Sequence, residues 1–303
     1  MPTPNFVQAT LSSCLLAITF ATATPQTPTP TPVPKESFYS MSPRAVIRLE
    51  HCEEIKKEGQ PAPTTQIVPD GTAFFVQSAD GVFAVTAGHV ASSPYNLHSR
   101  IPAARTSTGQ TQILQLSLPQ DRWIHHPDAG SPTRRGVDIA VMKIPQPRNL
   151  SLAVLQYCPE NCPAEAYNQL PQKDPEPPLQ VLVMGFPLDI GLQLVEQRPM
   201  GRQGLVALQS EEEFMKIEDK FVDKRAFLVD AKIFGGNSGS PILETHPFSP
   251  QIFLVGLAFA SNPTLDFAIA EPVSRIRETI DHAKNQDPNF NPWQPFTGCQ
   301  PHQ

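Results

Sequence analysis

The sequence predicts an all-β protein with two successive sets of antiparallel strands and a helix near its C-terminus. Short runs rich in Val, Ile, Phe and Thr recur between Gly, Pro, Asp and Ser, as in chains of short strands. A proline-rich stretch near the middle separates two groups of about six such runs, and neither group alternates with helices. Only one segment has strong helical periodicity. Two small barrels or sandwiches are therefore expected.

The first 41 residues precede the predicted folded region. Residues 1–23 resemble an export signal, because Leu11 to Ala23 is apolar or small and Ala21-Thr22-Ala23 fits a cleavage site. No Lys or Arg precedes the apolar run, so a cytoplasmic chain is the alternative to a secreted or periplasmic one. The run is too short for a transmembrane helix, and no stable membrane insertion is expected. Residues 24–41 form a Thr/Pro-rich linker of polyproline type.

The first strand group occupies residues 42–160, and the second occupies residues 178–271. Between them, the run Pro171–Pro178 can form neither a strand nor a helix interior. The predicted strands of the first group are Ala45–Leu49, Thr65–Val68, Thr72–Val76, Val82–Thr86, Ile113–Leu118 and Val137–Ile144. Those of the second group are Gln180–Gly185, Gly204–Leu208, Ala226–Ala231, Pro241–Leu243, Ile252–Ala260 and Asp266–Ala270.

A helix is predicted over residues 272–285, where Val273, Ile276 and Ile280 share one face and proline occupies the first turn. Residues 287–303 are rich in Asn, Gln and Pro. We expect this irregular tail either to wrap the surface or to be disordered.

Composition limits the classes of partner. The net charge is -6, with 23 basic and 29 acidic side chains and no basic cluster, so no nucleic-acid partner is expected. The sequence gives no prediction of oligomeric state.

Four cysteines follow the first segment, and in an exported chain they favour disulfides. Three pairings are open, of which a local Cys158–Cys162 bond with a long-range Cys52–Cys299 bond is our hypothesis. No second Cys or His pair accompanies Cys158 and Cys162, so no metal site is predicted.

Three short motifs carry candidate catalytic side chains. Ser238 lies in Gly236-Asn237-Ser238-Gly239, where a tight turn could present its hydroxyl beside free backbone N–H groups. A serine needs a base, and His89 follows an apolar strand in Thr86-Ala87-Gly88-His89. A histidine base needs an orienting carboxylate, and Asp138 opens an apolar strand. Each motif alone also fits an ordinary loop, a loop histidine or a capping aspartate.

The three motifs occur in the order His, Asp, Ser, with spacings of 49 and 100 residues. In this order they resemble the catalytic blocks of the trypsin-like (chymotrypsin-fold) serine proteases. The resemblance covers most of residues 44–284 and implies two antiparallel β-barrels of the chymotrypsin type with a C-terminal α-helix, in a protease domain spanning 42–286. It also makes the pair His125-His126, upstream of Asp138, structural.

Two branches of that family share local features with the chain. The run Gly235–Pro241 resembles the glutamyl-endopeptidase (V8-like) branch. Val229-Asp230-Ala231, Phe267-Ala268-Ile269 and the final helix are similar to the HtrA-like branch. No PDZ domain is expected after the helix.

The resemblance implies a serine endopeptidase that cleaves protein or peptide substrates through an acyl-enzyme, without a metal or cofactor. Ser238 would be the nucleophile, His89 the general base and Asp138 its orienting group. The backbone N–H groups of Gly236 and Ser238 would form the oxyanion hole. The alternative is a catalytically silent protease-like module that binds protein, with Arg202–Leu208 and Glu211–Lys224 as loops that block the cleft.

The same resemblance suggests a substrate pocket lined by Lys232, Phe259, Ala260, Ser261 and Asp266. Lys232 and Asp266 could pair with each other, contact a charged P1 side chain or point to solvent. Ala258 replaces the histidine of glutamyl endopeptidases, so glutamate specificity does not carry over. Asn237 replaces the aspartate that digestive relatives pair with a new N-terminus, so activity without N-terminal trimming is expected.

Overall fold

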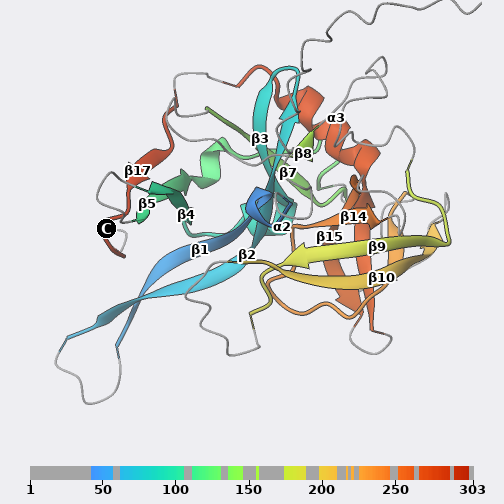
Figure 1. Cartoon of the computed structure of the whole chain (residues 1–303), viewed down its shortest axis with the longest axis horizontal. Helices are drawn as coiled ribbons and strands as arrows, with labels where there is room; N and C mark the ends of the chain where they lie inside the picture. Colours follow the sequence, from blue (N-terminus) through green and yellow to red (C-terminus); the bar gives the residue numbers. More distant parts are fainter. Residues whose placement is uncertain are drawn as a thin grey trace, which may run out of the picture. The chain divides into compact units, whose positions relative to one another are not determined.

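The second group of strands closes into a barrel in the computed structural model of the chain (Figure 1), with the order β10-β13-β16-β15-β14-β9. Its strands are β9 (Leu179–Gly185), β10 (Met200–Gln209), β13 (Phe227–Asp230), β14 (Ser240–Thr245), β15 (Ile252–Asn262) and β16 (Phe267–Pro272). All pairs are antiparallel. Alternate side chains point inward, and Val181, Val183 and Ile242 belong to the buried cluster that fills the barrel.

The residues described by the structure are 42–56, 62–105, 111–130, 136–145, 155–156, 174–188, 198–209, 216–217, 220–221, 225–245, 252–262, 266–286 and 290–299. All of them lie in one unit, Glu36–Gln303. The predicted export signal and linker, residues 1–41, lie outside this set, as do Cys158 and Cys162.

The first group of strands forms a nine-stranded sheet within the described residues, ordered β17-β5-β4-β1-β2-β3-β7-β6, with β8 beside β2. Its elements are η1 (Ser42–Ala45), β1 (Val46–Ile55), β2 (Thr64–Ser78), β3 (Gly81–Ala87), β4 (Leu97–Arg105), β5 (Thr111–Leu118), η2 (Gln120–Arg122), β6 (Ile124–His125), β7 (Ile139–Ile144), β8 (Leu155–Gln156) and β17 (Trp293–Pro295). A short ribbon, β11 (Lys216–Ile217) with β12 (Lys220–Phe221), stands apart from both sheets. The predicted all-β chymotrypsin-type fold is confirmed.

Two predicted strands, Thr65–Val68 and Thr72–Val76, are one continuous strand, β2. The intervening Pro69-Asp70-Gly71 was expected to break the strand, but it forms a β-bulge. Leu49 of β1 pairs with Gly71 and Glu50 pairs with Pro69, so Asp70 is the extra residue. Proline and glycine can mark a bulge as well as a turn.

The predicted C-terminal helix is confirmed as α3 (Val273–Ala283). Val273, Ile276 and Ile280 are fully buried, as their spacing predicted. The helix contacts β7 of the first sheet and β15 of the barrel, so its apolar face covers both groups of strands.

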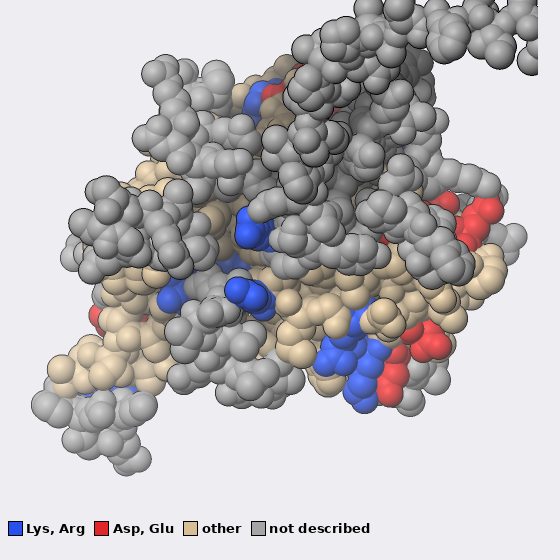
Figure 2. All heavy atoms as spheres, in the orientation of Figure 1, with Lys and Arg blue, Asp and Glu red and all other residues tan. Residues whose placement is uncertain are grey.

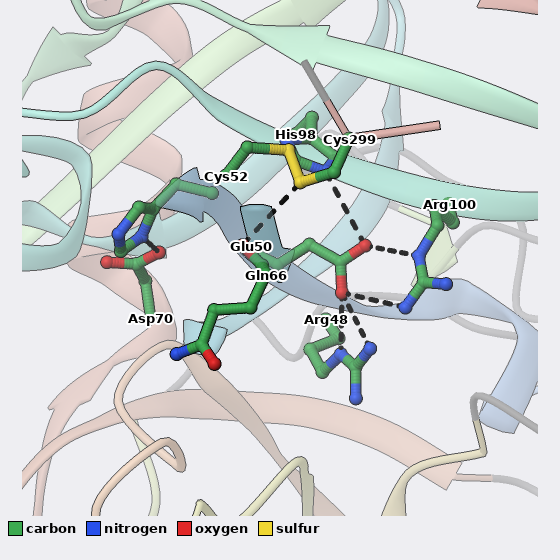
Figure 3. The surroundings of a disulfide bond; sticks show 9 residues. Arg48, Glu50, Cys52, Gln66, Asp70, His98, Arg100 and Cys299 are labelled. Carbon is green, nitrogen blue, oxygen red and sulfur yellow. Dashed lines mark hydrogen bonds and ion pairs between the residues drawn. A yellow bond between two sulfur atoms is a disulfide. The ribbon is translucent and has the colours of Figure 1, made fainter. Parts of the chain in front are cut away.

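The C-terminal tail is not irregular throughout. Residues 293–295 form β17, which pairs with β5, and the indole of Trp293 donates a hydrogen bond to the carbonyl of Pro145. Cys299 is bonded to Cys52 of β1, which confirms the predicted long-range disulfide (Figure 3). Sequence patterns missed the strand because its partner is far away in the chain.

A buried charge cluster lies beside this disulfide (Figure 3). Glu50 is fully buried and accepts hydrogen bonds from the guanidinium groups of Arg48 and Arg100. Burial of a carboxylate requires such charged partners. The cluster joins β1 to β4, and the disulfide joins β1 to the C-terminal tail.

On the face drawn in Figure 2, the described Lys and Arg side chains lie in small separate groups, some of them beside acidic side chains. Among the described helices, none is long and apolar enough to cross a membrane. The disulfide points to an extracytoplasmic protein.

His126 links the first sheet to α3 through two hydrogen bonds that only its neutral ring can make. Its Nδ1 accepts the Asp128 N–H (3.0 Å), and its Nε2 lies 3.0 Å from Glu278 of α3. Burial lowers the pKa of His126, although hydrogen bonding to Glu278 opposes this shift. Protonation at Nδ1 would place two donors against each other.

We therefore predict that His126 destabilises the fold in acid. The folded state binds the His126 proton less readily than the unfolded chain, so the free energy of unfolding falls as pH drops below the ordinary value of 6.5. One histidine contributes up to about 1.4 kcal/mol per pH unit. The slope between pH 7 and pH 5, measured by denaturant unfolding, should be smaller in His126→Asn than in wild type. Solvent-exposed His282→Asn is the control, and an unchanged slope in His126→Asn would contradict the prediction.

Candidate active site

His89 lies on a short helix rather than in a loop. This helix, α2 (Gly88–Ala91), directly follows the buried strand β3. The His89 backbone N–H donates to Oδ1 of Asp138 (2.8 Å), and its ring Nδ1 lies 2.7 Å from Oδ2 of the same carboxylate. Both carboxylate oxygens thus fix one histidine, and its Nε2 is left as the proton-accepting atom.

Asp138 is held firmly enough to act as that support. Its side chain is 10% exposed, against 45% for the His89 side chain. Its backbone carbonyl accepts the Gly88 N–H (3.1 Å). A Cβ at residue 88 would lie 2.9 Å from Oδ1 of Asp138, so glycine is required for this approach.

A second histidine borders the same carboxylate. His125, on β6, is half buried, and its Nδ1 lies close to Gly88. Burial lowers its pKa, while the negative charge of Asp138 acts in the opposite direction. The sequence analysis predicted a structural role for His125 and made no prediction of its position beside Asp138.

The loop that carries Ser238 is a tight turn shaped by two glycines with positive φ, Gly236 (85°) and Gly239 (88°). The Asn237 N–H donates to the Phe234 carbonyl (3.1 Å) and closes the turn. A Cβ at residue 236 would collide with the carbonyl oxygen of Phe186. Within the described residues, the N–H groups of Gly236 and Ser238 have no hydrogen-bond acceptor.

Thr72 of β2 fixes this loop from the first sheet. Its backbone N–H donates to the Ser238 carbonyl (2.9 Å), and its hydroxyl donates to the Gly236 carbonyl (2.8 Å). The same hydroxyl accepts the Phe186 N–H (3.1 Å). Because Thr72 binds the carbonyls of Gly236 and Ser238, the N–H groups of these two residues remain able to donate to another acceptor. Nothing in the strand pattern distinguished Thr72 from its neighbours.

Gly71 lies between the helix of His89 and the loop of Ser238. A Cβ on Gly71 would lie 3.0 Å from Val90 and 3.1 Å from the Ser238 carbonyl oxygen. The Ser238 hydroxyl donates to the Phe259 carbonyl on β15 (3.3 Å). Among the described residues, no hydrogen bond joins Ser238 to His89 in this state.

The predicted pocket residues divide into buried and exposed groups. Phe259 is buried, whereas Ser261 at the end of β15 is exposed, with Ala260 intermediate. Lys232 and Asp266 form an ion pair (3.0 Å), and their side chains are 55% and 53% exposed. Of the three outcomes considered for these two charges, the structure has the pair.

The sequence interpretation also missed Glu271, a buried acid whose carboxylate accepts the Asp138 N–H. The available signal was the same as that for Asp138, a charged residue within an apolar strand. Arg202–Leu208, expected as a blocking loop in the binding-module alternative, instead lies inside β10 of the barrel. Most of Glu211–Lys224 lies outside the described residues.

Comparison with known proteins identifies the family. The Trypsin family model matches residues 71–280, more than half of the chain, and the chain therefore belongs to the trypsin family. It is thus a protein of the protease class with the chymotrypsin fold. A search of curated proteins found no match.

The chain is also similar to solved structures at low sequence identity. The chain is similar to the "HtrA-type protease AlgW with decapeptide", at 16% identity and a TM-score of 0.49, over 82% of this chain and 67% of that one. It is also similar to the "Rv3671c protease from M. tuberculosis, active form", at 14% identity and a TM-score of 0.48, over 89% of this chain and 97% of that one. The family assignment rests on the Trypsin model.

The hydroxyl of Thr72 should contribute more to the free energy of unfolding than a buried hydroxyl that only adds to an existing helix hydrogen bond. Thr72→Val would leave the buried Phe186 N–H and the Gly236 carbonyl without this partner, at a cost of about 1–3 kcal/mol in unfolding free energy. The control is Thr279→Val, also fully buried, whose hydroxyl only adds to a carbonyl inside α3. Chemical denaturation should show the larger loss for Thr72→Val, and equal losses would contradict this role.

Proposed function

We propose that the chain is a secreted or periplasmic serine endopeptidase that uses Ser238, His89 and Asp138 as its catalytic triad. The observation that carries this proposal is the double contact between Asp138 and His89, through the ring Nδ1 and the backbone N–H. This arrangement fixes the tautomer in which Nε2 accepts a proton. The adjacent turn offers a serine hydroxyl and two N–H groups without acceptors among the described residues.

In the proposed reaction, the Ser238 hydroxyl leaves the Phe259 carbonyl and attacks the substrate carbonyl carbon while His89 Nε2 takes its proton. The substrate oxygen becomes an oxyanion that accepts hydrogen bonds from the N–H groups of Gly236 and Ser238. Each such donor contributes about 3–4 kcal/mol to lowering the barrier. Collapse breaks the peptide bond, and His89 protonates the departing amine.

Hydrolysis of the acyl-enzyme reverses these roles. His89 removes a proton from water, the resulting hydroxide attacks the ester carbon, and the Ser238 oxygen leaves with the proton held by His89. Asp138 remains ionised and stabilises the imidazolium at both stages. Every proton is transferred between chain and substrate or water, so the reaction needs no cofactor.

The Lys232–Asp266 pair bears on the proposed specificity. Each side chain is about half exposed, and each charge is already compensated by the other. A charged P1 residue would have to displace one partner, so we propose a preference for uncharged P1 side chains. A peptide library varied at P1 tests this choice, and a leading preference for Glu, Asp, Lys or Arg would reject it.

We predict that Ser238→Ala and His89→Ala each lower peptide hydrolysis at least about 1000-fold, because the triad acts as a unit. Hydrolysis is followed on a fluorogenic peptide library, with folding checked by circular dichroism. Ser240→Ala is the matched control, since Ser240 lies two positions from Ser238 and is fully buried. Folded wild type without hydrolysis would favour the protein-binding module, and activity equal to wild type in Ser238→Ala would show that Ser238 is not the nucleophile.

A further inference from the structure

We propose that Glu271 is a positioning residue for the triad acid. Its Oε1 accepts the Asp138 backbone N–H at 3.1 Å, and the residue is 1% exposed. This inference rests on the proposed triad, since it assigns Glu271 the task of holding Asp138 where its carboxylate reaches His89. It adds a fourth side chain to the three carried by the sequence motifs.

The cost of burying Glu271 indicates that its carboxyl has a task. Ile269, on the same face of β16 as Glu271, is buried and apolar, so the acid at residue 271 interrupts an apolar face. An acid in such a place costs free energy unless its hydrogen bonds compensate. Buried acids that contact a catalytic group are functional candidates.

Glu271 connects the two strand groups at the site. Asp138 belongs to the first group, immediately before β7, whereas Glu271 ends β16 of the barrel. Opposite Glu271 on β15 is Leu257, and two residues further along that strand is Phe259, whose carbonyl accepts the Ser238 hydroxyl. One strand pair therefore contacts both the nucleophile and the triad acid, which fixes their separation.

Asp138 is consequently held on three sides. Its carbonyl accepts the Gly88 N–H, its N–H donates to Glu271 and its carboxylate contacts His89 twice. Titratable side chains next to Asp138 in the described part of the chain include His89, His125 and Glu271. If the Glu271 acceptor is removed, the Asp138 backbone is free to shift, and the two contacts to His89 are lengthened.

Three variants separate positioning from simple packing. Glu271→Gln keeps a carbonyl oxygen that can accept the Asp138 N–H, Glu271→Met keeps the volume without an acceptor, and Glu271→Asp withdraws the carboxyl by one methylene. We predict kcat within about threefold of wild type for Glu271→Gln and a fall of about 10-fold or more for the other two, by analogy with the scale seen when a residue that orients a metal ligand is lost. KM should stay within about twofold in all three, because the substrate does not touch Glu271.

A second readout does not need activity. The proton between His89 Nδ1 and Asp138 gives a low-field NMR resonance, assigned by its loss in His89→Ala. It should persist in Glu271→Gln and shift or broaden in Glu271→Met and Glu271→Asp. If wild type hydrolysed no peptide, this resonance would still test the positioning of Asp138 separately from the proposed function.

Two results would overturn the proposal. One is a Glu271→Met protein that unfolds at lower temperature but keeps the wild-type kcat and resonance, because Glu271 would then be merely structural. The other is an equal loss of kcat in Glu271→Gln and Glu271→Met, because the charge would then matter and the hydrogen bond to Asp138 would not. If Glu271→Met does not fold, the same comparison is made between Glu271→Gln and Glu271→Asp.

Discussion

The candidate site depends on hydrogen bonds between the first sheet and the barrel, above all those of Thr72. One residue of β2 holds two carbonyls of the Ser238 turn and one N–H of the strand end at Phe186. The turn that carries Ser238 and the helix that carries His89 would not be stable on their own. A turn with positive φ glycines and a four-residue helix have little intrinsic stability. Their geometry is therefore set by contacts made across the junction, by Thr72 on one side and Glu271 on the other.

Local patterns predicted most of the fold and the motif-bearing part of the site. Alternating apolar runs located eleven of the strands approximately, and the spacing of Val273, Ile276 and Ile280 located α3. The motif order selected His89 and Asp138, which do lie in contact, and Ser238. These features depend on residues close together in the chain, so periodicity and turn-forming residues are enough to predict them.

What the sequence could not supply are pairings between distant residues. The apolar residues of β4 do not alternate with its polar ones, and the strand contains Pro102, while β17 lies in a tail rich in turn-forming residues. Both strands are therefore stabilised by their partners rather than by local preference. Thr72 and His125 have no local pattern that marks them, because their importance comes from what lies opposite. Glu271 had only the signal of a charged residue within an apolar strand, which does not identify its partner. The Asp70 bulge likewise depends on the register of β1 against β2.

Charge at the site is arranged in pairs of different exposure. His89–Asp138 combines an accessible ring with a nearly buried carboxylate, which keeps the proton-accepting nitrogen open to substrate. Lys232–Asp266 is exposed at both ends, so solvent screens it and it contributes little to stability. In the proposed function, the first pair serves proton transfer and the second influences the selection of substrate side chains.

The central claim is that Ser238 is a nucleophile activated by His89. It is tested most directly by treating the folded protein with a fluorophosphonate and locating the adduct by peptide mass spectrometry. The account predicts one phosphonate on Ser238 of the wild type and none on Ser238 of the His89→Ala protein. An unlabelled wild-type protein, or equal labelling of Ser238 with and without His89, would contradict it.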